Sequence, residues 1–467
     1  MPKDTSGGSG GTGISARWQQ VLDEEEMADV TPVTINGEPT TGMSYAPASA
    51  SRHEWASSLR KSWQAVLDEE GMGEYVPRIA YGQPTVGIDP PIHEGDMHLS
   101  VIVPCYNQAA YLREGLESVL ENDQIDMEVV VVDDGSSDTS PDIVRAIASV
   151  DPRVRLVSIP NGGYGHAVNI GLSEARGVYV AIFEPGDYVL PHMYDELVKM
   201  AERSMPGDGD LPDVMKSSYW RVLRSGTLNE TRMHCSYYKR VRHSDGSHFT
   251  IAEEPELLRH HPSIWSALYR RSFLEAFGIR MIEAPGAGWV DGPFLYETLC
   301  LARSISYTDE AWYCYREDLA GSSSSGDVGL LSAERWNDMM DVVERLGIDD
   351  EGVLSALHLT GFRYIQRIFD EGGWDKPKEM EAVTGIFARM DLTIVPGLDA
   401  VPARLRKMAF EINGEYAPEM DDRGHQLALI REFGMTLMTD GVSGALTRTA
   451  MALDKGSRAS DGTESEA

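Results

Sequence analysis

Four apolar segments alternate with helical segments between residues 98 and 183, and this alternation constrains the fold more than any other feature. The apolar segments are HLSVIVPCYN, MEVVVVDD, VRLVSI and VYVAIF, at residues 98–107, 127–134, 154–159 and 178–183. The intervening segments place apolar side chains at helical spacing. Short apolar runs without polar alternation are typical of strands buried on both faces. The sequence therefore predicts an α/β fold in which helices cover both sides of a mostly parallel sheet.

Composition supports a folded core and narrows the choice of partners. The chain has 467 residues, enough for about three domains, and 42% of them are hydrophobic. Its 74 acidic and 41 basic residues give a formal net charge of −33. Such a surface repels nucleic acid, so we expect no nucleic-acid partner, and an anionic substrate would need a local basic patch or a metal ion. The same charge also serves solubility, which is its simpler interpretation.

The four cysteines lie far apart in the sequence and form no CxxC pair. They are Cys105, Cys235, Cys300 and Cys314. This pattern predicts reduced thiols, with neither a zinc site nor a disulfide framework. No apolar run approaches the roughly 18 residues of a membrane span, and residues 1–13 lack the apolar stretch of a signal peptide. We therefore expect a cytoplasmic protein without a transmembrane segment.

The first 95 residues contain a repeat with a period of 45. WQQVLDEEEMADVTPVTINGEPTTG begins at Trp18 and WQAVLDEEGMGEYVPRIAYGQPTVG begins at Trp63, and 13 of the 25 aligned positions are identical. Each copy reads as a short amphipathic helix followed by an extended segment rich in Pro and Gly. Two copies are too few for a solenoid core. Two interpretations stay open: a duplicated docking peptide, for a partner protein or for the rest of the chain, and a duplicated linker with little order.

The pattern changes again after the alternating segments. Residues 213–320 mix β-like stretches, such as DVMKSSYWRVL and AWYCYRE, with helical ones, and from Leu331 onward the spacing is helical. We predict four parts of the chain. They are a repeat-containing, partly disordered extension at 1–95, a domain at 96–325 with halves at 96–212 and 213–325, a helical accessory region at 326–456 and a polar, disordered tail at 457–467.

Polar side chains follow three of the predicted strands, as Tyr106-Asn107, DDGSS at residues 133–137 and EPGD at residues 184–187. In an open parallel α/β sheet, ligands bind at the carboxyl ends of the strands, so we expect a ligand site there. Taken singly, each stretch is also compatible with a turn or a helix N-cap. NGGYGHAVNIG, at residues 161–171, is a weak phosphate or dinucleotide signal. A dehydrogenase is a poor match because these glycines follow the third strand rather than the first.

The order and spacing of these motifs resemble those of the family 2 glycosyltransferases, which have the GT-A fold. The resemblance extends over roughly residues 99–325 and rests on SVIVPCYN, VVVVDDGSSDTS, NGGYGHAVNIGLSEARGVYVAIFEPGDYV, HPSIWSALYRRSFL and PGAGWVDGPF. The chain is most similar to bacterial, non-processive members that build surface polysaccharides, and it lacks the QxxRW signature of processive synthases. The resemblance implies a Rossmann-like, mostly parallel sheet that binds a nucleotide sugar, with helices over it and a helical region after it.

The resemblance also implies which residues hold the donor. The positions are Pro104, Tyr106, Asn107, Asp134, Gly163, Gly165 and Asn169. The first two line the base pocket in the family, and Asp134 occupies the position that accepts a hydrogen bond from uracil or a similar base. A helix that begins near the two glycines would direct its backbone N–H groups at the nucleotide or the sugar. Asn169 belongs to a family motif whose preceding residue is often Arg, and here that residue is Val168.

The EPGD turn departs from the family pattern. Family members carry Asp-x-Asp at this point, and it holds Mg²⁺ or Mn²⁺ against the diphosphate. Here the first acid is Glu184, Gly186 occupies the position of the principal ligand, and Asp187 follows. Hard divalent ions need only one or two carboxylates plus phosphate oxygens, so Glu184 and Asp187 are the candidate ligands. Three hypotheses stay open: a shifted metal site, turnover without a metal, and loss of transferase activity.

The resemblance assigns the catalytic base to Asp291, in GAGWVDGPF. Inverting transfer is a single displacement that requires a carboxylate to accept the proton of the acceptor hydroxyl. The alternative role for Asp291 is a helix N-cap, since Gly292-Pro293 would form the first helical turn.

Phosphate and acceptor contacts are expected from two further regions. The basic run YYKRVRHSDGSH, at residues 237–248, includes Arg240 and Arg242, although a solvated loop is its simpler interpretation. By resemblance, Tyr315 and Arg316 lie near the acceptor and could contact phosphate, and Trp265 lies in the matched HPSIW stretch.

Our main hypothesis is an inverting glycosyltransferase of the hexosyltransferase type. It would move a sugar from a nucleotide-sugar donor, a UDP-sugar in the first place, to a hydroxyl of a saccharide or lipid-linked acceptor in cell-surface polysaccharide synthesis. A lipid-linked acceptor would bring this cytoplasmic protein to the inner face of the membrane as a peripheral protein. The alternative is a catalytically impaired scaffold that binds sugar nucleotides and recruits a partner through its N-terminal repeat.

Overall fold

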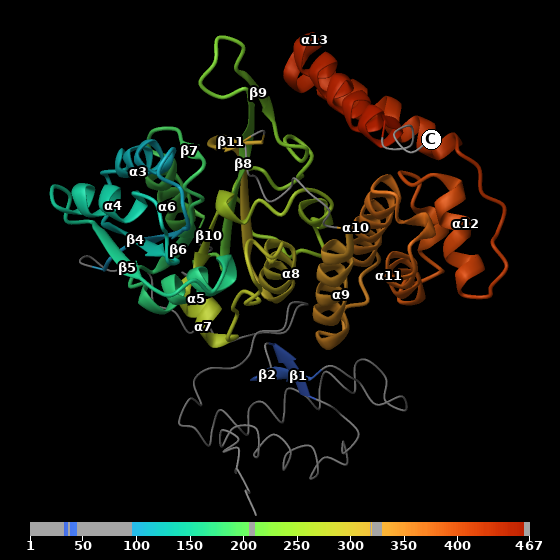
Figure 1. Ribbon diagram of the computed structural model, residues 1–467, viewed down its shortest axis with the longest axis horizontal. Coiled ribbons are helices and arrows are strands. Elements are labelled where there is room, and N and C mark those ends of the chain that lie inside the picture. The colour runs from blue at the N-terminus through green and yellow to red at the C-terminus, as the bar shows by residue number, and fades with distance from the viewer. Residues whose placement is uncertain are drawn as a thin grey trace, which may run out of the picture. The chain divides into compact units, whose positions relative to one another are not determined.

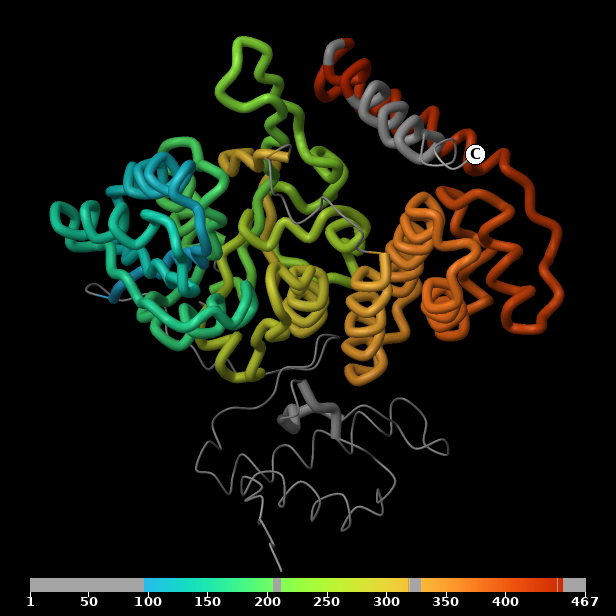
Figure 2. Tube along the Cα trace, in the orientation of Figure 1, coloured from blue at the N-terminus to red at the C-terminus, as the bar shows by residue number. Residues whose placement is uncertain are grey.

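The computed structural model describes residues 32–35, 38–43, 96–204, 211–317, 319 and 329–461 (Figures 1 and 2). Within the N-terminal extension it describes strands β1 (Pro32–Ile35) and β2 (Glu38–Met43), which pair antiparallel. Both lie in the part of the first repeat that the sequence predicts to be extended. The predicted helices of the repeat and its whole second copy lie outside the described residues.

A nine-stranded sheet carries the predicted α/β pattern, in the order β5-β4-β3-β6-β10-β8-β11-β7, with β9 paired to β8. Its first four strands along the chain are β3 (Leu99–Cys105), β4 (Met127–Asp133), β5 (Val154–Ser158) and β6 (Tyr179–Ile182). They pair in parallel, and every residue of β3, β4 and β6 is buried. The predicted parallel sheet with continuously apolar strands is therefore confirmed.

Helices follow these strands as the sequence predicts. They are α3 (Leu112–Leu120), α4 (Ser140–Ala148), α5 (Tyr164–Glu174) and α6 (Met193–Arg203). The strand order runs outward from β3 to β4 to β5 and then returns to β6 on the other side of β3. Because such crossovers are right-handed, α3 and α4 lie on one face of the sheet and α5 lies on the other (Figure 1). The carboxyl ends of β3, β4 and β6 consequently share one edge, which the following loops cover.

The second half of the sheet is mixed. It consists of β7 (Tyr188–Val189), β8 (Val214–Leu223), β9 (Thr231–His234), β10 (Ala267–Arg270) and β11 (Ile305–Arg316), with α7 (Arg271–Ala276) and α8 (Asp291–Leu301). Strand β10 is antiparallel to β6 and to β8, whereas β11 is parallel to β8. Arg270 and Asp213 form an ion pair inside this half, and their side chains are 1% and 0% exposed. Removing either partner would leave a buried charge, at a cost of about 3–5 kcal/mol.

Helices form the last third of the chain, as predicted. They are α9 (Gly329–Arg345), α10 (Glu351–Asp370), α11 (Pro377–Ala388), α12 (Ala403–Ile412) and α13 (Arg423–Asp461). Asp350 caps α10, since its side chain accepts a hydrogen bond from the Val353 amide at 2.9 Å. None of the described helices is long and apolar enough to cross a membrane.

The long helix α13 is interrupted at Gly441, where φ is 69°. Its backbone continues to Asp461, past the predicted start of the disordered tail at residue 457, whereas residues 462–467 lie outside the described part. Asp440 accepts hydrogen bonds from the backbone and ring nitrogens of His234, at 2.9 and 2.8 Å. Glu432 pairs with Arg240 at 2.6 Å. These contacts join α13 to the segment around β9 within the compact unit formed by Arg78–Val342 and Asp349–Ala467. The remaining predicted domain boundaries stay predictions.

Candidate active site

The loops after β3 and β4 are tied together at the carboxyl edge of the sheet. Asn107, whose φ is 54°, accepts a hydrogen bond from the Ser137 amide at 2.8 Å, and its own amide donates to Ser136 Oγ at 3.0 Å. Tyr106 is 50% exposed beside it. Pro104, in contrast, is buried within β3 opposite Val132. Among these predicted base-binding residues, Tyr106 is thus the one whose ring is open to a ligand.

Asp134 stabilises the loop that leads into α5. Its two carboxylate oxygens accept hydrogen bonds from the amides of Gly162 and Gly163, at 2.7 and 2.9 Å, and the residue is 3% exposed. Each carboxylate oxygen has two lone pairs, so a further donor can still be accepted. The structure therefore gives Asp134 a structural role, and its contact with a nucleobase stays a prediction.

The glycines at the start of α5 permit a close backbone contact. A Cβ atom on Gly163, whose φ is 92°, would lie 2.2 Å from the carbonyl oxygen of Ala284, and one on Gly165 would lie 2.0 Å from that of Ile282. The Tyr164 amide donates to the Gly286 carbonyl at 2.8 Å. The helix end is therefore packed against residues 282–286. Its contact with a nucleotide stays a prediction.

Asn169 binds the same segment. Its amide group donates to the Met281 carbonyl at 2.9 Å and to Glu283 at 3.0 Å, and its oxygen accepts from the Met281 amide at 2.8 Å. Glu283, which sequence reasoning missed, also pairs with His166 Nδ1 at 3.0 Å. Val168 is fully buried in the core, which explains an apolar residue at a position where the family often has Arg.

The EPGD turn lies at the end of β6 and is held by β11. Tyr313 donates its hydroxyl hydrogen to Asp187 at 2.9 Å and accepts from the Glu184 amide at 3.2 Å. The Arg316 amide donates to the other carboxylate oxygen of Asp187 at 2.8 Å. Tyr164 donates to Glu184 at 3.3 Å, which connects the turn to the start of α5. Sequence reasoning missed Tyr313 because strand alternation alone does not reveal which turn a buried hydroxyl meets.

Both acids of the turn have perturbed pKa values. Burial, together with the negative charges of Asp187 and Asp291, raises the pKa of Glu184 to about 8. Burial raises the pKa of Asp187 to about 7, although the hydrogen bonds from Arg316 and Tyr313 act in the opposite direction. Three carboxyl groups therefore lie close enough to repel one another when ionised. The three acids do not form a group of ligand atoms within 4.8 Å of one another among the described residues, so a divalent ion here would take a single accessible carboxylate plus phosphate oxygens.

Asp291 is the first residue of α8, and its N-cap is Val290. Three residues in the left-handed region precede the helix: Gly286, Gly288 and Trp289, with φ of 67°, 64° and 52°. The Asp291 side chain is half-buried and makes no hydrogen bond to any described residue. Its charge acts on Glu184, as noted above, and also on Tyr164 and Tyr315. The structure thus brings the predicted base to the acid turn, and the alternative N-cap role is wrong.

Stacked aromatic rings form one wall beside the acids. Trp265, which is 2% exposed, stacks on Tyr313 and Tyr315 with ring centroids 4.0 and 5.2 Å away. Lys216 holds the turn that carries Trp265, since its Nζ donates to the carbonyl and hydroxyl oxygens of Ser263 at 2.8 and 3.1 Å. Burial lowers the pKa of Lys216 to about 7. The predicted acceptor residues Trp265 and Tyr315 therefore do lie with the acid turn.

The predicted basic run has other partners. Arg240 pairs with Glu432, as described above, and Arg242 pairs with Glu254 at 3.2 Å. Arg316 pairs with Glu114 at 2.6 Å and donates to the Gly186 carbonyl at 2.9 Å, so it supports the backbone of the EPGD turn. A role for Arg240 and Arg242 toward a leaving group stays a prediction that no described contact supports.

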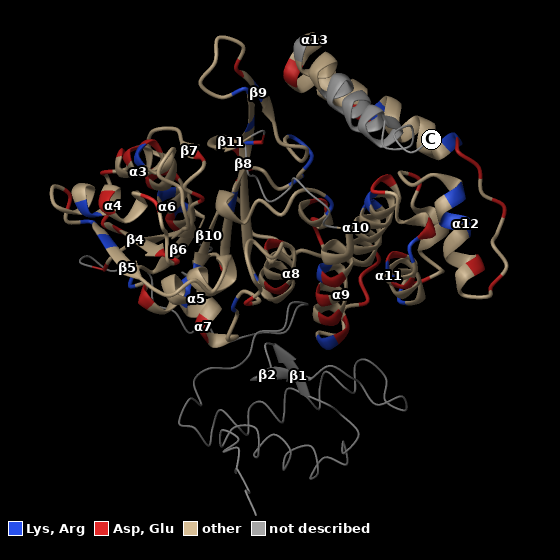
Figure 3. Ribbon diagram, in the orientation of Figure 1, with Lys and Arg blue, Asp and Glu red and all other residues tan. Residues whose placement is uncertain are grey.

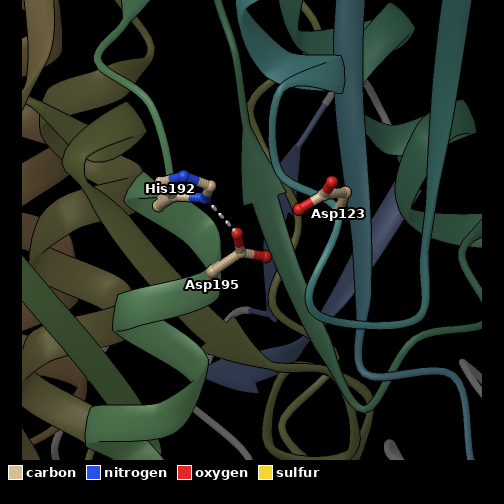
Figure 4. Close-up of side chains that lie close together, drawn as sticks. All are labelled: Asp123, His192 and Asp195. Carbon is tan, nitrogen blue, oxygen red and sulfur yellow. Dashed lines mark hydrogen bonds and ion pairs between the residues drawn. The ribbon is translucent and has the colours of Figure 1, made fainter.

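A second group of possible metal ligands is formed by Asp123, His192 and Asp195, whose ligand atoms lie within 4.8 Å of one another (Figure 4). The group lies where α3 connects to β4, at the amino end of that strand and away from the acid turn. Asp195 accepts from His192 Nδ1 at 2.8 Å and from the Gln124 amide at 3.1 Å. The hydrogen bond to Asp151 raises the pKa of Arg153, and the negative charges of Asp123 and Asp195 add to that shift, so this guanidinium also acts on the group. The group formed by Asp123, His192 and Asp195 stabilises the start of α6.

Comparison with known proteins agrees with this architecture. S. aureus TarS, residues 1–349, in a crystal structure with UDP-GlcNAc, superposes with a TM-score of 0.53 at 20% identity, over 71% of this chain and 90% of that one. This likeness shows the fold, so the domain has the GT-A fold that defines a large class of glycosyltransferases. Residues 100–278 match the family "Glycosyl transferase family 2". Over this segment the chain is therefore similar to glycosyltransferase family 2.

Curated relatives are similar over the same part of the chain. The uncharacterized glycosyltransferase EpsJ of Bacillus subtilis is 29% identical over 226 residues, which are 47% of this chain and 61% of EpsJ. The uncharacterized glycosyltransferase YibD of Escherichia coli is 30% identical over 224 residues, 46% of this chain and 60% of YibD. The succinoglycan biosynthesis protein ExoO of Rhizobium meliloti is 39% identical over 118 residues, 25% of this chain and 32% of ExoO. The alignments thus cover about three fifths of the length of EpsJ and YibD.

Proposed function

We propose that this chain is an inverting glycosyltransferase that moves a sugar from a UDP-sugar to a hydroxyl of a saccharide or lipid-linked acceptor in cell-surface polysaccharide synthesis. The observation that carries the proposal is the convergence of Glu184, Asp187 and Asp291 at the carboxyl edge of the sheet, beside the aromatic wall. The UDP-GlcNAc in the TarS crystal structure and the succinoglycan role in the name of ExoO support the donor and the process.

Asp291 is the base in this proposal. Its carboxylate has no partner among the described residues, so it can accept the proton of the acceptor hydroxyl as that oxygen attacks the sugar. The reaction then needs no enzyme nucleophile, because the acceptor oxygen displaces the nucleoside diphosphate in one step. The loop that precedes α8 determines where this carboxylate lies, and the partly exposed ring of Tyr315, backed by the buried ring of Trp265, offers a surface for the acceptor.

Glu184 is the ligand we assign to Mg²⁺ or Mn²⁺, with Asp187 behind it. Asp187 is 2% exposed, and both of its carboxylate oxygens already accept hydrogen bonds. Glu184 is more accessible and keeps one carboxylate oxygen without a described partner. One protein carboxylate plus phosphate oxygens is an arrangement that Mg²⁺ tolerates. The ion would neutralise the diphosphate as it leaves, in place of the ligand that Gly186 cannot provide.

The alternative proposal is a scaffold that binds sugar nucleotides without turnover. The occupied oxygens of Asp187, together with the glycine at position 186, favour it, because they leave a single accessible carboxylate at the turn. Binding of UDP-sugars without transfer or hydrolysis, with and without Mn²⁺, would support this alternative over the enzyme.

A donor screen by thermal shift, followed by activity assays on the donors that bind, tests the proposal. The decisive variant is Asp291→Asn, which keeps the size of the side chain but removes its basicity. Loss of a general base reduces turnover by about 10²–10⁴-fold, so we expect transfer to fall by that factor while donor binding is kept. Asp142→Asn, on the surface of α4, is the matched control. Transfer that survives in Asp291→Asn would show that the base is elsewhere.

A further inference from the structure

A cavity with a volume of about 460 Å³ lies between the start of α3 and the hairpin of β8 and β9. The residues around it are Tyr111, Glu114, Tyr188, Arg224, Ser225, Gly226, Glu230, Arg232, Arg316 and Leu319. Most of them carry hydroxyl groups or charges. A volume in the range of ordinary small-molecule sites with so polar a lining is suited to a hydrophilic ligand rather than to an apolar one.

The cavity borders the backbone of the acid turn, since Arg316 donates to the Gly186 carbonyl at 2.9 Å, but its side chains lie on the face of β11 opposite the acid cluster. Successive side chains of a strand point to opposite faces. Tyr313 and Tyr315 meet Trp265 on the face of the acid cluster. Arg316 points the other way, where its guanidinium lies 4.7 Å from the ring centroid of Tyr188 and 5.6 Å from that of Tyr111. The donor site proposed above therefore does not account for the cavity.

The charges around the cavity favour an anion. Among the described residues that line it, three are arginines and two are glutamates, so basic side chains exceed acidic ones by one in a chain whose net charge is −33. Figure 3 shows basic and acidic residues together on the hairpin of β8 and β9. Arg316, with a side chain that is 5% exposed, is fixed by Glu114, by Ser225 and by the Gly186 carbonyl, which occupy all three of its guanidinium nitrogens, so it contributes a fixed positive charge at the wall of the cavity. Arg232 lies over the other side of the hairpin, 5.7 Å from the ring of Tyr188 and 3.1 Å from Glu230.

We propose that this cavity binds a phosphate ester of a polyol or saccharide, with the phosphate among Arg224, Arg232 and Arg316. Guanidinium groups bind both phosphate and carboxylate oxygens with paired N–H donors, and the three arginines around one cavity match the larger number of oxygens on a phosphate. The hydroxyl groups of the ligand would bond to Glu230, Ser225 and the tyrosine hydroxyls. A bare phosphate ion would leave most of the volume empty, whereas a phosphorylated polyol or monosaccharide fills it.

Titration by calorimetry of the full-length protein with glycerol 3-phosphate and ribose 5-phosphate tests this proposal, with glycerol and ribose as unphosphorylated controls. We expect the two esters to bind and the controls not to bind. Arg232→Gln and Arg224→Gln should each weaken binding of the esters at least tenfold. Arg113→Gln, an exposed arginine of α3 that pairs with Glu117 at 3.5 Å, should not change it. Thermal unfolding of each variant verifies that the protein is folded, and Arg224 lies in an exposed turn where substitution is tolerated.

A repeat of the titration with saturating UDP separates this site from the donor site. Unchanged affinity for ribose 5-phosphate is the expected result. The proposal is overturned if the esters do not bind, if UDP competes with them, or if Arg113→Gln weakens binding as much as Arg232→Gln. None of these readouts depends on sugar transfer, so the proposed glycosyltransferase activity can fail while this site stands.

Discussion

Restoring a carboxylate at position 186 would show whether the departure from Asp-x-Asp limits metal binding. In Gly186→Asp the new Cβ would meet one atom of the described residues within 4 Å, Leu319 Cδ1 at 3.0 Å, which is the end of a flexible side chain. Gly186 is also absent from the residues with positive φ, so an aspartate needs no unusual backbone there. We therefore expect the variant to fold.

The electrostatic cost of a third carboxylate at position 186 can be estimated. At an effective dielectric constant of about 20, two unit charges about 6 Å apart repel by about 3 kcal/mol. A third carboxylate beside Glu184 and Asp187 should thus destabilise the metal-free protein by an energy of this order when the acids are ionised. A divalent ion makes the net electrostatic interaction favourable, because it attracts each carboxylate. After the cost of desolvation is subtracted, we expect the free energy of Mn²⁺ binding to improve by at least about 1.4 kcal/mol, which is a tenfold lower Kd for Mn²⁺.

The assay is calorimetric titration with Mn²⁺, combined with thermal unfolding in the presence and absence of the ion. Gly186→Asn is the control, since it adds a side chain of equal size without the charge. Without Mn²⁺, Gly186→Asp should unfold at a lower temperature than Gly186→Asn. With Mn²⁺, the two variants should unfold at similar temperatures. The metal-dependent turnover of Gly186→Asp should also rise. Equal Mn²⁺ affinity in the two variants would refute the assignment of the metal to this turn.

Two further predictions concern stability and the N-terminal extension. Burial lowers the pKa of Lys216 from 10.5 to about 7, so between these pH values the unfolded chain binds more protons than the folded one. The free energy of unfolding should therefore rise with pH across that window, by about 1.4 kcal/mol per pH unit. Urea unfolding at pH 7.5 and 9 should show this rise in the wild type but not in Lys216→Met, and an equal rise in both would contradict it. Deletion of residues 1–95 should leave kcat and KM for transfer unchanged. Loss of activity in a deletion variant that still folds would show that the repeat is required for catalysis.

The first half of the fold was predictable because its signals are local. The alternation of apolar strands and helices from β3 to β6 follows from side-chain spacing, and parallel topology follows from the absence of polar alternation. The same reasoning predicts a ligand site at the carboxyl ends of the strands, where the structure brings the acid turn and the loops after β3 and β4 together. Strands β7 and β10 were not predicted, because strands of two and four residues carry too little pattern.

Partners within the site were less predictable because they join distant parts of the chain. Asp134 and the glycines of α5 make contacts within the protein that the sequence did not predict, while their contact with a nucleotide stays a prediction. Tyr313 lies 126 positions from Asp187, and no sequence pattern links the two. Arg240 likewise meets Glu432 across 192 positions. Spacing predicts which elements form, whereas the choice of partner for a polar side chain depends on how those elements pack.

The bond between Asp440 and His234 has a consequence for the order of synthesis. The two residues are 206 positions apart, so at about 5–20 residues per second the hairpin leaves the ribosome about 10–40 s before its support from α13. The sheet can form earlier, because its strands are complete at Arg316. A nascent chain cleaved before α13 would therefore keep its catalytic sheet, while the hairpin that carries Arg232 would lose the anchor next to it.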